Sequence, residues 1–312
     1  MPSLYPAYQV QAVKDIYISS FVSLINEPPV DSHVREALFA RKLELLYERH
    51  SSVLVQMAKG AYELRQKIRT NQIIDLDTDS FEHMNECHAF LDRFYMSRIG
   101  IRVLAGQYLA LRNSSMDGYI GLIYQHTSPY EVVRQAVTDA SFMCENKYGA
   151  FPKVIIKGRL DLTFAYIPTQ LHYMLLELLK NAMRATVEHH GFDPRKWPPI
   201  EVVIADGQSN EDVVIKISDE GGGIPRSNRK KIWSYLFTTA DPAIQDSLVG
   251  MDNNVDHSVD APLAGLGYGL PISKSYARYF GGDISIESME GYGSDAFVHL
   301  RRLGDSREPL PV

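Results

Sequence analysis

Residues Ser218–Pro225 read SDEGGGIP and directly follow the apolar run DVVIKI. A short apolar run of this kind is typical of a buried strand. Glycine weakens helices and strands, so three consecutive glycines indicate a backbone that turns sharply or passes close to another group. Taken alone, these eight residues fit a turn, because Asp is a common turn residue, as well as they fit a ligand-binding loop. The rest of the chain has to separate these two interpretations.

Composition limits the class of protein. The chain has 312 residues, a net charge of −6 and 45% hydrophobic residues, which together predict about two packed domains. The acidic balance disfavours a dedicated nucleic-acid binder, and no apolar run approaches the roughly 20 residues of a membrane span. Cys87 and Cys144 provide neither a metal-binding spacing nor a disulfide framework. The start MPSLYPAYQV has the features of neither a signal peptide nor an Arg- and Ser-rich presequence, and it does not indicate a compartment.

The first part of the chain has helical periodicity. Apolar residues recur at alternating steps of three and four from Phe39 to Ile68 and again from Met84 to Tyr108, which predicts long amphipathic helices. A further helix is predicted over Val10–Leu24, before the breaker NEPP. Antiparallel helices that bury such seams form a bundle, which we expect over residues 1–125.

Two polar residues interrupt the apolar seams of these helices. His50 fits a packed core histidine better than a phosphorylated or metal-binding one. Arg98 is expected either to pair with a buried carboxylate or to extend its charged end to the surface.

The second part, residues 126–312, alternates short strands with helices. Ser128-Pro129 has the features of a helix start, and further helices are predicted over Thr169–His190 and Leu270–Phe280. The predicted strands are KVIIKG, EVVIAD, DVVIKIS, DISIES and DAFVHL. This pattern predicts an α+β sandwich, a mixed sheet with helices on one face. The irregular stretch at about 240–264 is interpreted as a lid.

Three segments carry residues suited to ligand chemistry. Glu177 and Asn181 lie four residues apart on a predicted helix and therefore share one face. Asp219 ends a buried strand, where its carboxylate can accept a hydrogen bond from an exocyclic amine. The sequence Gly265-x-Gly267-x-Gly269 opens a helix, and free backbone amides at a helix N-terminus favour an anion. Each feature has an ordinary structural explanation by itself, but their combination in this order predicts an adenine-nucleotide pocket.

The order of these segments resembles the ATP-binding domain shared by DNA gyrase, heat-shock chaperones, sensor histidine kinases and mismatch-repair ATPases. ELLKNAMRAT is similar to its N box, and SDEGGG and GLGYGLPIS are similar to its two glycine boxes. FLDRFYMSRIGIR, at 90–102, and MEGYGSDAFVHL narrow the resemblance to the mitochondrial α-ketoacid dehydrogenase kinases, from Asp15 to Pro309. That family joins a four-helix bundle to this ATPase domain, so the resemblance implies the same α+β architecture here.

The resemblance implies roles for the matching residues. Glu177 corresponds to the general base that accepts the proton of a substrate serine, Asn181 to the residue that binds Mg²⁺, and Asp219 to the acceptor for the adenine amino group. The other residues expected around ATP are Leu178, Leu179, Lys180, Ala182, Met183, Arg184, Gly223, Thr238, Thr239, Gly265, Leu266, Gly267, Tyr268, Gly269 and Leu270. Carbonyls around Ile232, Ser234 and Phe237 correspond to a K⁺ site in relatives.

The resemblance also implies partners and a compartment. Members of the family phosphorylate a serine of the E1α subunit of a mitochondrial dehydrogenase complex and thereby inactivate it, and their helical half binds a lipoyl domain of the E2 core. They are usually homodimers of the mitochondrial matrix. We therefore expect a protein serine kinase of the pyruvate dehydrogenase complex that has no nucleic-acid partner.

Departures from the family pattern leave the choice of substrate open. Tyr173 lies four residues before Glu177, where many pyruvate dehydrogenase kinases have His and branched-chain relatives have Tyr. FTTA is also closer to the branched-chain type, whereas YGLPIS and ARYFGGD are closer to pyruvate dehydrogenase kinases of plants and fungi. Gln107-Tyr108 replaces a common Gln-His pair. The branched-chain dehydrogenase E1α is therefore the alternative substrate.

Two further functions are compatible with an ATPase domain of this type. A sensor histidine kinase requires an exposed phosphoacceptor histidine, for which His50 is the candidate in the first long helix. A nucleotide-gated scaffold would bind ATP without transferring phosphate.

Overall fold

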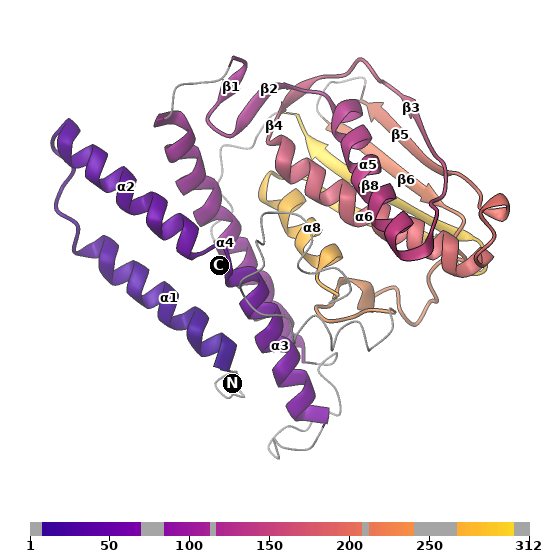
Figure 1. Cartoon of the computed structure of the whole chain (residues 1–312), viewed down its shortest axis with the longest axis horizontal. Helices are drawn as coiled ribbons and strands as arrows, with labels where there is room; N and C mark the ends of the chain where they lie inside the picture. Colours follow the sequence, from indigo (N-terminus) through magenta and orange to yellow (C-terminus); the bar gives the residue numbers. More distant parts are fainter. Residues whose placement is uncertain (1–7, 70–83, 113–116, 208–211, 240–266, 303–312) are drawn as a thin grey trace.

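The computed structural model describes residues 8–69, 84–112, 117–207, 212–239 and 267–302. It consists of an N-terminal group of helices and an α+β part that lies beside it (Figure 1). The helices of the first group are α1 (Tyr8–Ile25), α2 (His33–Arg49), α3 (Val53–Arg69) and α4 (Asn85–Arg112). The expected helical bundle followed by a sandwich domain is confirmed.

The predicted single helix from Phe39 to Ile68 is wrong, because the chain breaks into α2 and α3. His50 caps α2 with φ −82° and ψ 0°, and Ser51 and Ser52 separate the two helices. Serine competes with helical hydrogen bonding through its own hydroxyl, which favours a break at this point. The apolar spacing continues across the break because both helices bury a face, α2 against α4 and α3 against α1.

The two polar residues of the seams are both buried at this break. His50 is hydrogen-bonded to Ser20 Oγ at 2.8 Å and meets the ring of Tyr17 edge to face, so it is a packed core histidine, as expected. Arg98 donates to the backbone carbonyl of His50 at 3.1 Å. The expectation that Arg98 pairs with a carboxylate or reaches the surface is wrong, because a carbonyl oxygen satisfies part of its guanidinium inside the bundle.

A five-stranded mixed sheet forms the α+β part. Its order is β3-β5-β6-β8-β7, with β3 parallel to β5 and the other neighbours antiparallel. The strands are β3 (Val154–Gly158), β5 (Ile200–Asp206), β6 (Asp212–Asp219), β7 (Asp283–Met289) and β8 (Gly293–Arg301). All five predicted strands are therefore present.

A second, three-stranded sheet was not predicted. It has the order β1-β2-β4, from strands β1 (Tyr119–Ile120), β2 (Ile123–Thr127) and β4 (Phe164–Tyr166). These strands have two to five residues, too few for an alternating pattern to stand out from the surrounding sequence.

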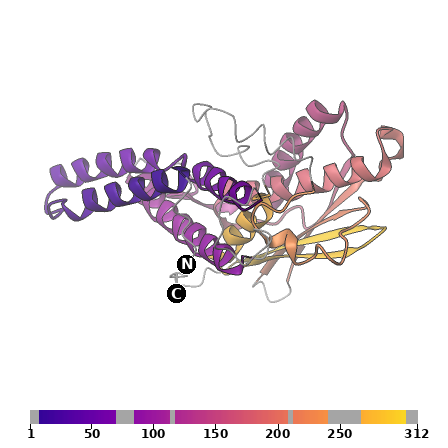
Figure 2. The ribbon, with the colours of Figure 1, turned by 90° about the horizontal axis from the view of Figure 1, so that it is seen from below.

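Three helices cover one face of the larger sheet: α5 (Pro129–Tyr148), α6 (Pro168–His190) and α8 (Gly269–Tyr279). Figure 2 shows α5 and α6 on the same side of the strands. Ser128 Oγ caps α5 by accepting from the amide of Glu131, and Gly149 ends the helix with φ 79°. Two short 3-10 helices, Pro194–Lys196 and Lys231–Trp233, lie in the connections.

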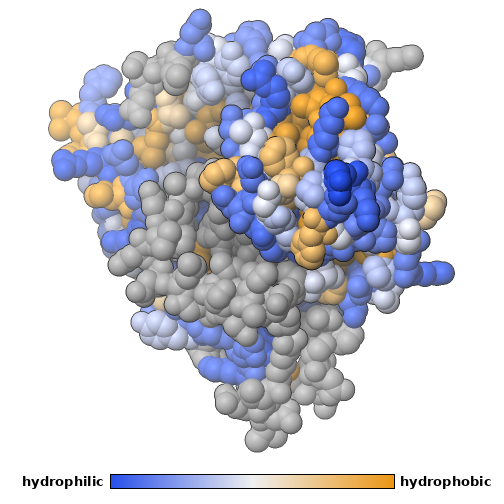
Figure 3. Space-filling model, turned by 45° about the vertical axis from the view of Figure 1, so that its right-hand side comes forward, coloured by the Kyte–Doolittle hydropathy of each residue, from blue (hydrophilic) through white to orange (hydrophobic). Residues whose placement is uncertain are grey.

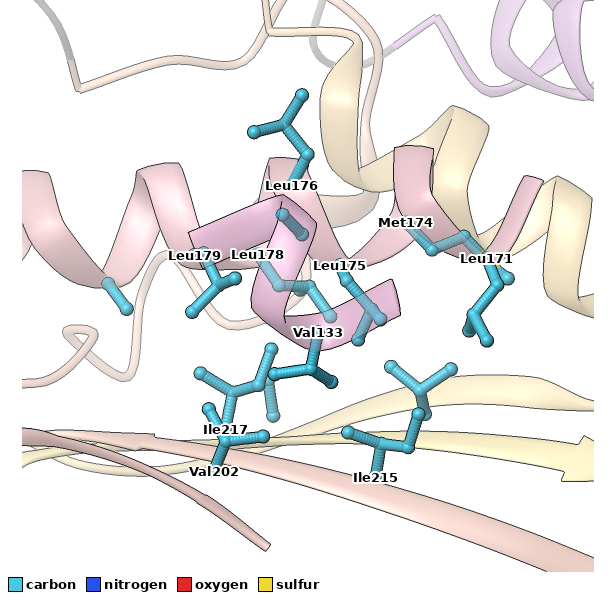
Figure 4. Close-up of a cluster of buried hydrophobic side chains, with 14 of the residues drawn as sticks. Val133, Leu171, Met174, Leu175, Leu176, Leu178, Leu179, Val202, Ile215 and Ile217 are labelled. Carbon is cyan, nitrogen blue, oxygen red and sulfur yellow. The ribbon is translucent and has the colours of Figure 1, made fainter. Parts of the chain in front are cut away.

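The core of the α+β part lies between α6 and the sheet. Leu175, Leu178 and Leu179 of α6 point toward Ile215 and Ile217 of β6 (Figure 4). Leu176 points to the opposite side of the helix in the same view. The leucines of LLELLKN are therefore buried on more than one side of α6. The polar residues Glu177 and Asn181 of the same stretch are not part of this core.

A second core joins the two parts of the molecule. Tyr235, Tyr268 and Ile272 from the α+β part pack in one cluster with Leu91 and Tyr95 of α4. The rings of Tyr95, Tyr235 and Tyr268 lie within 6.0 Å of one another, centroid to centroid. The helical part is thus attached through buried aromatic side chains.

Hydrophilic and apolar residues are mixed on the described surface. On the face drawn in Figure 3, hydrophilic side chains surround separate groups of apolar ones. Among the described helices, none combines the length and hydropathy needed to span a bilayer.

Candidate active site

A cavity of about 230 Å³ opens between α6, the end of β6, the segment Phe237–Thr239 and the start of α8. Residues predicted from the sequence make up half of its lining. They are Glu177, Leu178, Asn181, Ala182, Arg184, Asp219, Gly223, Thr238, Thr239, Gly267, Gly269 and Leu270. The acid–amide helix, the strand end and the second glycine segment therefore face one space, although up to 93 positions separate them in the chain.

Glu177 and Asn181 lie one turn apart on α6 and both line this cavity. Glu177 is 7% exposed, and its Oε1 accepts a hydrogen bond from Lys180 Nζ at 2.5 Å. This bond restricts the rotamers of the carboxylate. A buried carboxylate next to an amide oxygen provides the hard oxygen groups suited to proton transfer and to Mg²⁺.

Asp219 lies at the carboxyl end of β6, on the far wall of the cavity. Burial raises its pKa to about 6, although hydrogen bonds from the backbone amides of Gly221 and Ser294 act in the opposite direction. The Gly221 bond measures 2.8 Å. A carboxylate that is buried without a cationic partner is best satisfied by a further donor, such as the amino group of a ligand.

The three glycines after Asp219 are required by the backbone. A Cβ on Gly221 would lie 2.5 Å from the Cβ of Ala185 on α6. Gly222 and Gly223 have φ values of 80° and 69°, which other residues rarely adopt. Both interpretations of SDEGGG are therefore compatible with the structure: the segment turns sharply and approaches α6 closely, and it forms one wall of the cavity.

The second glycine segment brings a helix start to the other wall. Gly267 has φ 78°, and a Cβ on Gly269 would lie 2.2 Å from Glu177 Oε2. The amide groups at the start of α8 therefore lie beside the carboxylate of Glu177, and the N-cap Tyr268 provides no side-chain cap bond. Free amides at a helix start suit phosphate oxygens. Gly265 and Leu266 lie outside the described residues, as does the predicted lid.

The hydroxyl-bearing segment after the 3-10 helix completes the rim. Thr239 Oγ1 accepts a hydrogen bond from Arg184 Nη2 at 2.9 Å. Arg184 thus connects α6 with the opposite side of the cavity mouth. Both residues, together with Thr238, were predicted near the nucleotide.

Four predicted residues do not line the cavity. Leu179 and Met183 are buried in the core against the sheet, and Tyr268 is buried in the core between the two parts. Lys180 contributes through its bond to Glu177.

The apolar part of the cavity was missed by sequence reasoning. It includes Ile217, Ile224, Pro225, Ile286 and Ala296. These residues lie on or next to the same strands as the core residues, and only the neighbouring SDEGGG distinguished this end of β6. A flat base needs such an apolar surface beside Asp219.

The residues fit a nucleotide-bound cation better than a metal cluster held by protein. Among the described residues there is no group of three or more His, Cys, Asp or Glu side chains that could hold a metal ion. Mg²⁺ is usually held by one or two side chains together with phosphate oxygens and water. Asn181 and Glu177 match that requirement.

Two family models match separate parts of the chain. Residues 166–303 match the histidine kinase-, DNA gyrase B- and HSP90-like ATPase, and residues 3–124 match the mitochondrial branched-chain alpha-ketoacid dehydrogenase kinase. The fold and the cavity therefore define an ATP-binding domain of the gyrase B and HSP90 class that is joined to a helical bundle.

Named relatives match nearly the whole chain. A mitochondrial [pyruvate dehydrogenase (acetyl-transferring)] kinase of Arabidopsis thaliana is 44% identical over 97% of this chain and 78% of the relative. The corresponding kinase of Schizosaccharomyces pombe is 44% identical over 87% of this chain and 61% of the relative. Isozyme 4 of Homo sapiens is 36% identical over 97% of this chain and 71% of the relative. The chain belongs to the mitochondrial α-ketoacid dehydrogenase kinase family.

Proposed function

We propose that this chain is an ATP-dependent protein serine kinase that phosphorylates and inactivates the E1α subunit of the mitochondrial pyruvate dehydrogenase complex. The observation that carries the proposal is the meeting of Glu177, Asn181, Asp219 and the Gly267–Leu270 segment in one cavity. Relatives that are 36–44% identical and bear the name of this kinase support the choice of reaction.

Each residue has a task that follows from its position. Asp219 would accept from the adenine amino group, and the apolar surface of Ile217 and Ile286 would contact the base. The amides at the start of α8 would hold phosphate oxygens. Glu177 would take the proton of the substrate serine, because its carboxylate lies at the phosphate end of the cavity beside Gly269.

Two cations belong to the proposal. Asn181, which lines the cavity, would hold Mg²⁺ through its amide oxygen, and the ion would supply charge neutralisation on the phosphates when bound. Carbonyls around Ile232, Ser234 and Phe237 would hold K⁺, and two of these residues line the cavity. Calorimetric titration of ATP in potassium and in sodium buffer tests the second cation, and equal affinities would remove it from the proposal.

The proposed partners and location follow from the family. We place the protein in the mitochondrial matrix, with the E1α subunit as its substrate and a lipoyl domain of E2 as its docking partner. A homodimer joined through the ATPase-domain sheets is the proposed assembly, with residues 1–125 as the regulatory half. Sedimentation of the purified chain, with and without a lipoyl domain, tests both associations.

One observation favours the branched-chain complex as the alternative substrate. Tyr173 lies four residues before Glu177, where branched-chain relatives have Tyr, and its ring packs against Tyr276 at a centroid distance of 5.4 Å. The first family model also carries the branched-chain name. Incubation with ATP and each purified E1 separates the two. Selective phosphorylation of the pyruvate dehydrogenase E1α is expected, and equal inactivity on both would contradict the proposed reaction.

His50 does not suit the histidine-kinase alternative. Its side chain is buried and hydrogen-bonded to Ser20, whereas a phosphoacceptor must reach the γ-phosphate. Acid-labile phosphate on His50 after incubation with ATP would reverse this preference.

A further inference from the structure

Leu236 adopts a backbone conformation that leucine normally avoids. Its φ is 65°, and within the described ranges it is the only residue other than glycine with positive φ. A leucine persists in this region only where surrounding contacts determine its conformation. It lies two residues before Thr238, in the segment that forms one wall of the cavity.

The contacts that hold this segment come from the helical half. Arg65 of α3 donates from Nη1 to the carbonyl of Leu236 at 2.9 Å. Tyr235 donates its hydroxyl to Asp92 Oδ1 of α4 at 2.7 Å. Arg65, Tyr235 and Leu236 are all at least 93% buried. The bond from Arg65 is closed to water and therefore costly to lose, whereas the bond from Tyr235 is only partly buried because Asp92 is exposed.

The same segment supports the second glycine loop. Leu236 donates its amide to the carbonyl of Gly267 at 3.2 Å. A Cβ on Gly267 would lie 2.4 Å from the carbonyl oxygen of Phe237. Two walls of the cavity are therefore in direct backbone contact, and a change in the conformation of Leu236 would displace both Thr238–Thr239 and the start of α8.

We propose that Arg65 and Asp92 are positioning residues of the nucleotide site, which hold Leu236 in its left-handed conformation and so place Thr238 and Gly267 against the nucleotide. The helical half is then a structural part of the ATP site. This inference rests on the proposed ATP-dependent function. Neither residue touches the cavity itself, because neither is among its lining residues.

The first test measures ATP binding and kinetics in the full chain. R65A should raise the Kd and the KM for ATP about tenfold, the effect of losing a buried charged hydrogen bond, while kcat stays within about twofold because α6 keeps Glu177 in place. R65K retains a donor and should recover most of the affinity. The control is R102A, because Arg102 donates to the carbonyl of Tyr47 wholly within the helical half.

A second test separates backbone positioning from a general loss of stability. Glycine adopts φ 65° without help, so the effect of R65A on the Kd for ATP should shrink to about twofold or less in an L236G background. If R65A does not fold, Y235F decides instead. It keeps the buried ring, removes the hydroxyl that bonds to Asp92 and Ser275, and should weaken ATP binding about threefold.

The outcomes distinguish this inference from the proposed function. A wild-type chain that binds no Mg-ATP contradicts both. If the wild-type chain binds ATP, three results would contradict this inference alone. R65A or Y235F could bind ATP as tightly as wild type, or R102A could lose as much affinity for ATP as R65A. The third is that the L236G background leaves the effect of R65A on the Kd for ATP unchanged.

Discussion

Two carboxylates of the cavity have different surroundings and therefore suit different tasks. Glu177 has the ammonium of Lys180 at 2.5 Å, which keeps its carboxylate in one orientation beside the start of α8. Within the described part of the chain, the donors to Asp219 are the backbone amides of Gly221 and Ser294, and burial raises its pKa to about 6. A group with such a pKa is poorly satisfied until a ligand contributes a donor, which suits recognition of the base.

Replacement of Glu177 by glutamine tests the assignment of the general base. The E177Q side chain keeps the shape but cannot take the serine proton, so phosphate transfer to E1α should fall by at least about a hundredfold. The Kd for ATP should change by less than about threefold, because the adenine contacts remain. Radiolabel transfer and calorimetry measure the two quantities.

The control for this variant is E201Q. Glu201 forms a similar pair with Lys157, at 2.6 Å, on the sheet and away from the cavity. E201Q should retain wild-type turnover. Normal turnover in E177Q would contradict the base assignment, and loss of ATP binding together with turnover would make Glu177 a binding residue instead.

The raised pKa of Asp219 predicts how stability depends on pH. A carboxyl whose pKa is higher in the folded state than in the unfolded state favours folding in its protonated form, so its contribution falls as pH rises from about 4 to about 6. D219N removes this cost and should raise the free energy of unfolding of the nucleotide-free protein by up to about 3 kcal/mol at pH 8 and about half that at pH 5. The same variant should bind ATP more weakly.

Asp283 provides a control of opposite sign. Burial raises its pKa, but the charge of Lys274, the backbone amide of Ile284 and the charge and hydrogen bond of Arg278 together outweigh this effect and hold the pKa below its usual range. D283N should therefore destabilise the protein at pH 8, and its effect should disappear as pH falls through the pKa of the folded state. Chemical denaturation at several pH values measures the free energy of unfolding of both variants. If the gain in this free energy from D219N, relative to wild type, were smaller at pH 8 than at pH 5, the raised pKa assigned to Asp219 would be contradicted.

At the scale of elements, glycines decide how closely loops and helices approach in the cavity. Gly267 and Gly291 have similar φ values, 78° and 84°, but only Gly267 is surrounded by backbone atoms within 3 Å of where a Cβ would lie. The positive φ alone costs about 1 kcal/mol for alanine. Any loss of stability beyond this when alanine replaces Gly267 measures the contact between the two walls of the cavity.

This comparison gives a prediction for a matched pair of variants. G267A should lose at least about tenfold in ATP affinity, because the added methyl group forces the loop away from Phe237. G291A should lose only about 1 kcal/mol of stability and keep its affinity for ATP. Equal ATP affinities in the two variants would show that the close approach at Gly267 has no role in binding.

Elements with a strong periodicity could be predicted from the sequence, and short or interrupted ones could not. The α6 helix, the five strands and the glycine segments follow from spacing, residue type and turn residues. The break at Ser51 is not predicted from the apolar spacing, because that spacing continues from α2 into α3. Residues such as Ile286 and Ala296 are assigned to the cavity only when β8 is known to lie beside β6 and β7 beside β8.

At the scale of the whole molecule, the two halves are visible in the sequence but their contact is not. Tyr95, Tyr235 and Tyr268 come from three distant segments and meet in one buried cluster. No period or motif relates the three residues to one another, and the motif that contains Tyr268 predicts a place near ATP and not in this core. The left-handed Leu236 is equally unmarked, because leucine carries no sequence signal for positive φ. Long-range packing therefore determines the part of the site that local pattern cannot predict.

The shared core predicts that the two halves unfold together. Ile272 of α8 is 1% exposed and packs in this core, and α8 also contacts α4 and α6. Fluorescence of Trp197 and Trp233, which both lie in the α+β half, should therefore change at the same denaturant concentration as far-UV circular dichroism, which is dominated by the helices.

I272A should lower the free energy of unfolding by about 2–5 kcal/mol and shift both signals. The control is V34A, because Val34 lies on the exposed side of α2 at 72% exposure, and it should shift neither. Mg-ATP is expected to contact only the α+β half, yet it should stabilise the circular dichroism transition as much as the fluorescence transition, because the helical half shares a buried core with Tyr235 and Tyr268. Helicity that persists after the fluorescence change would mean that the bundle folds independently, and the ATP site would then not depend on it.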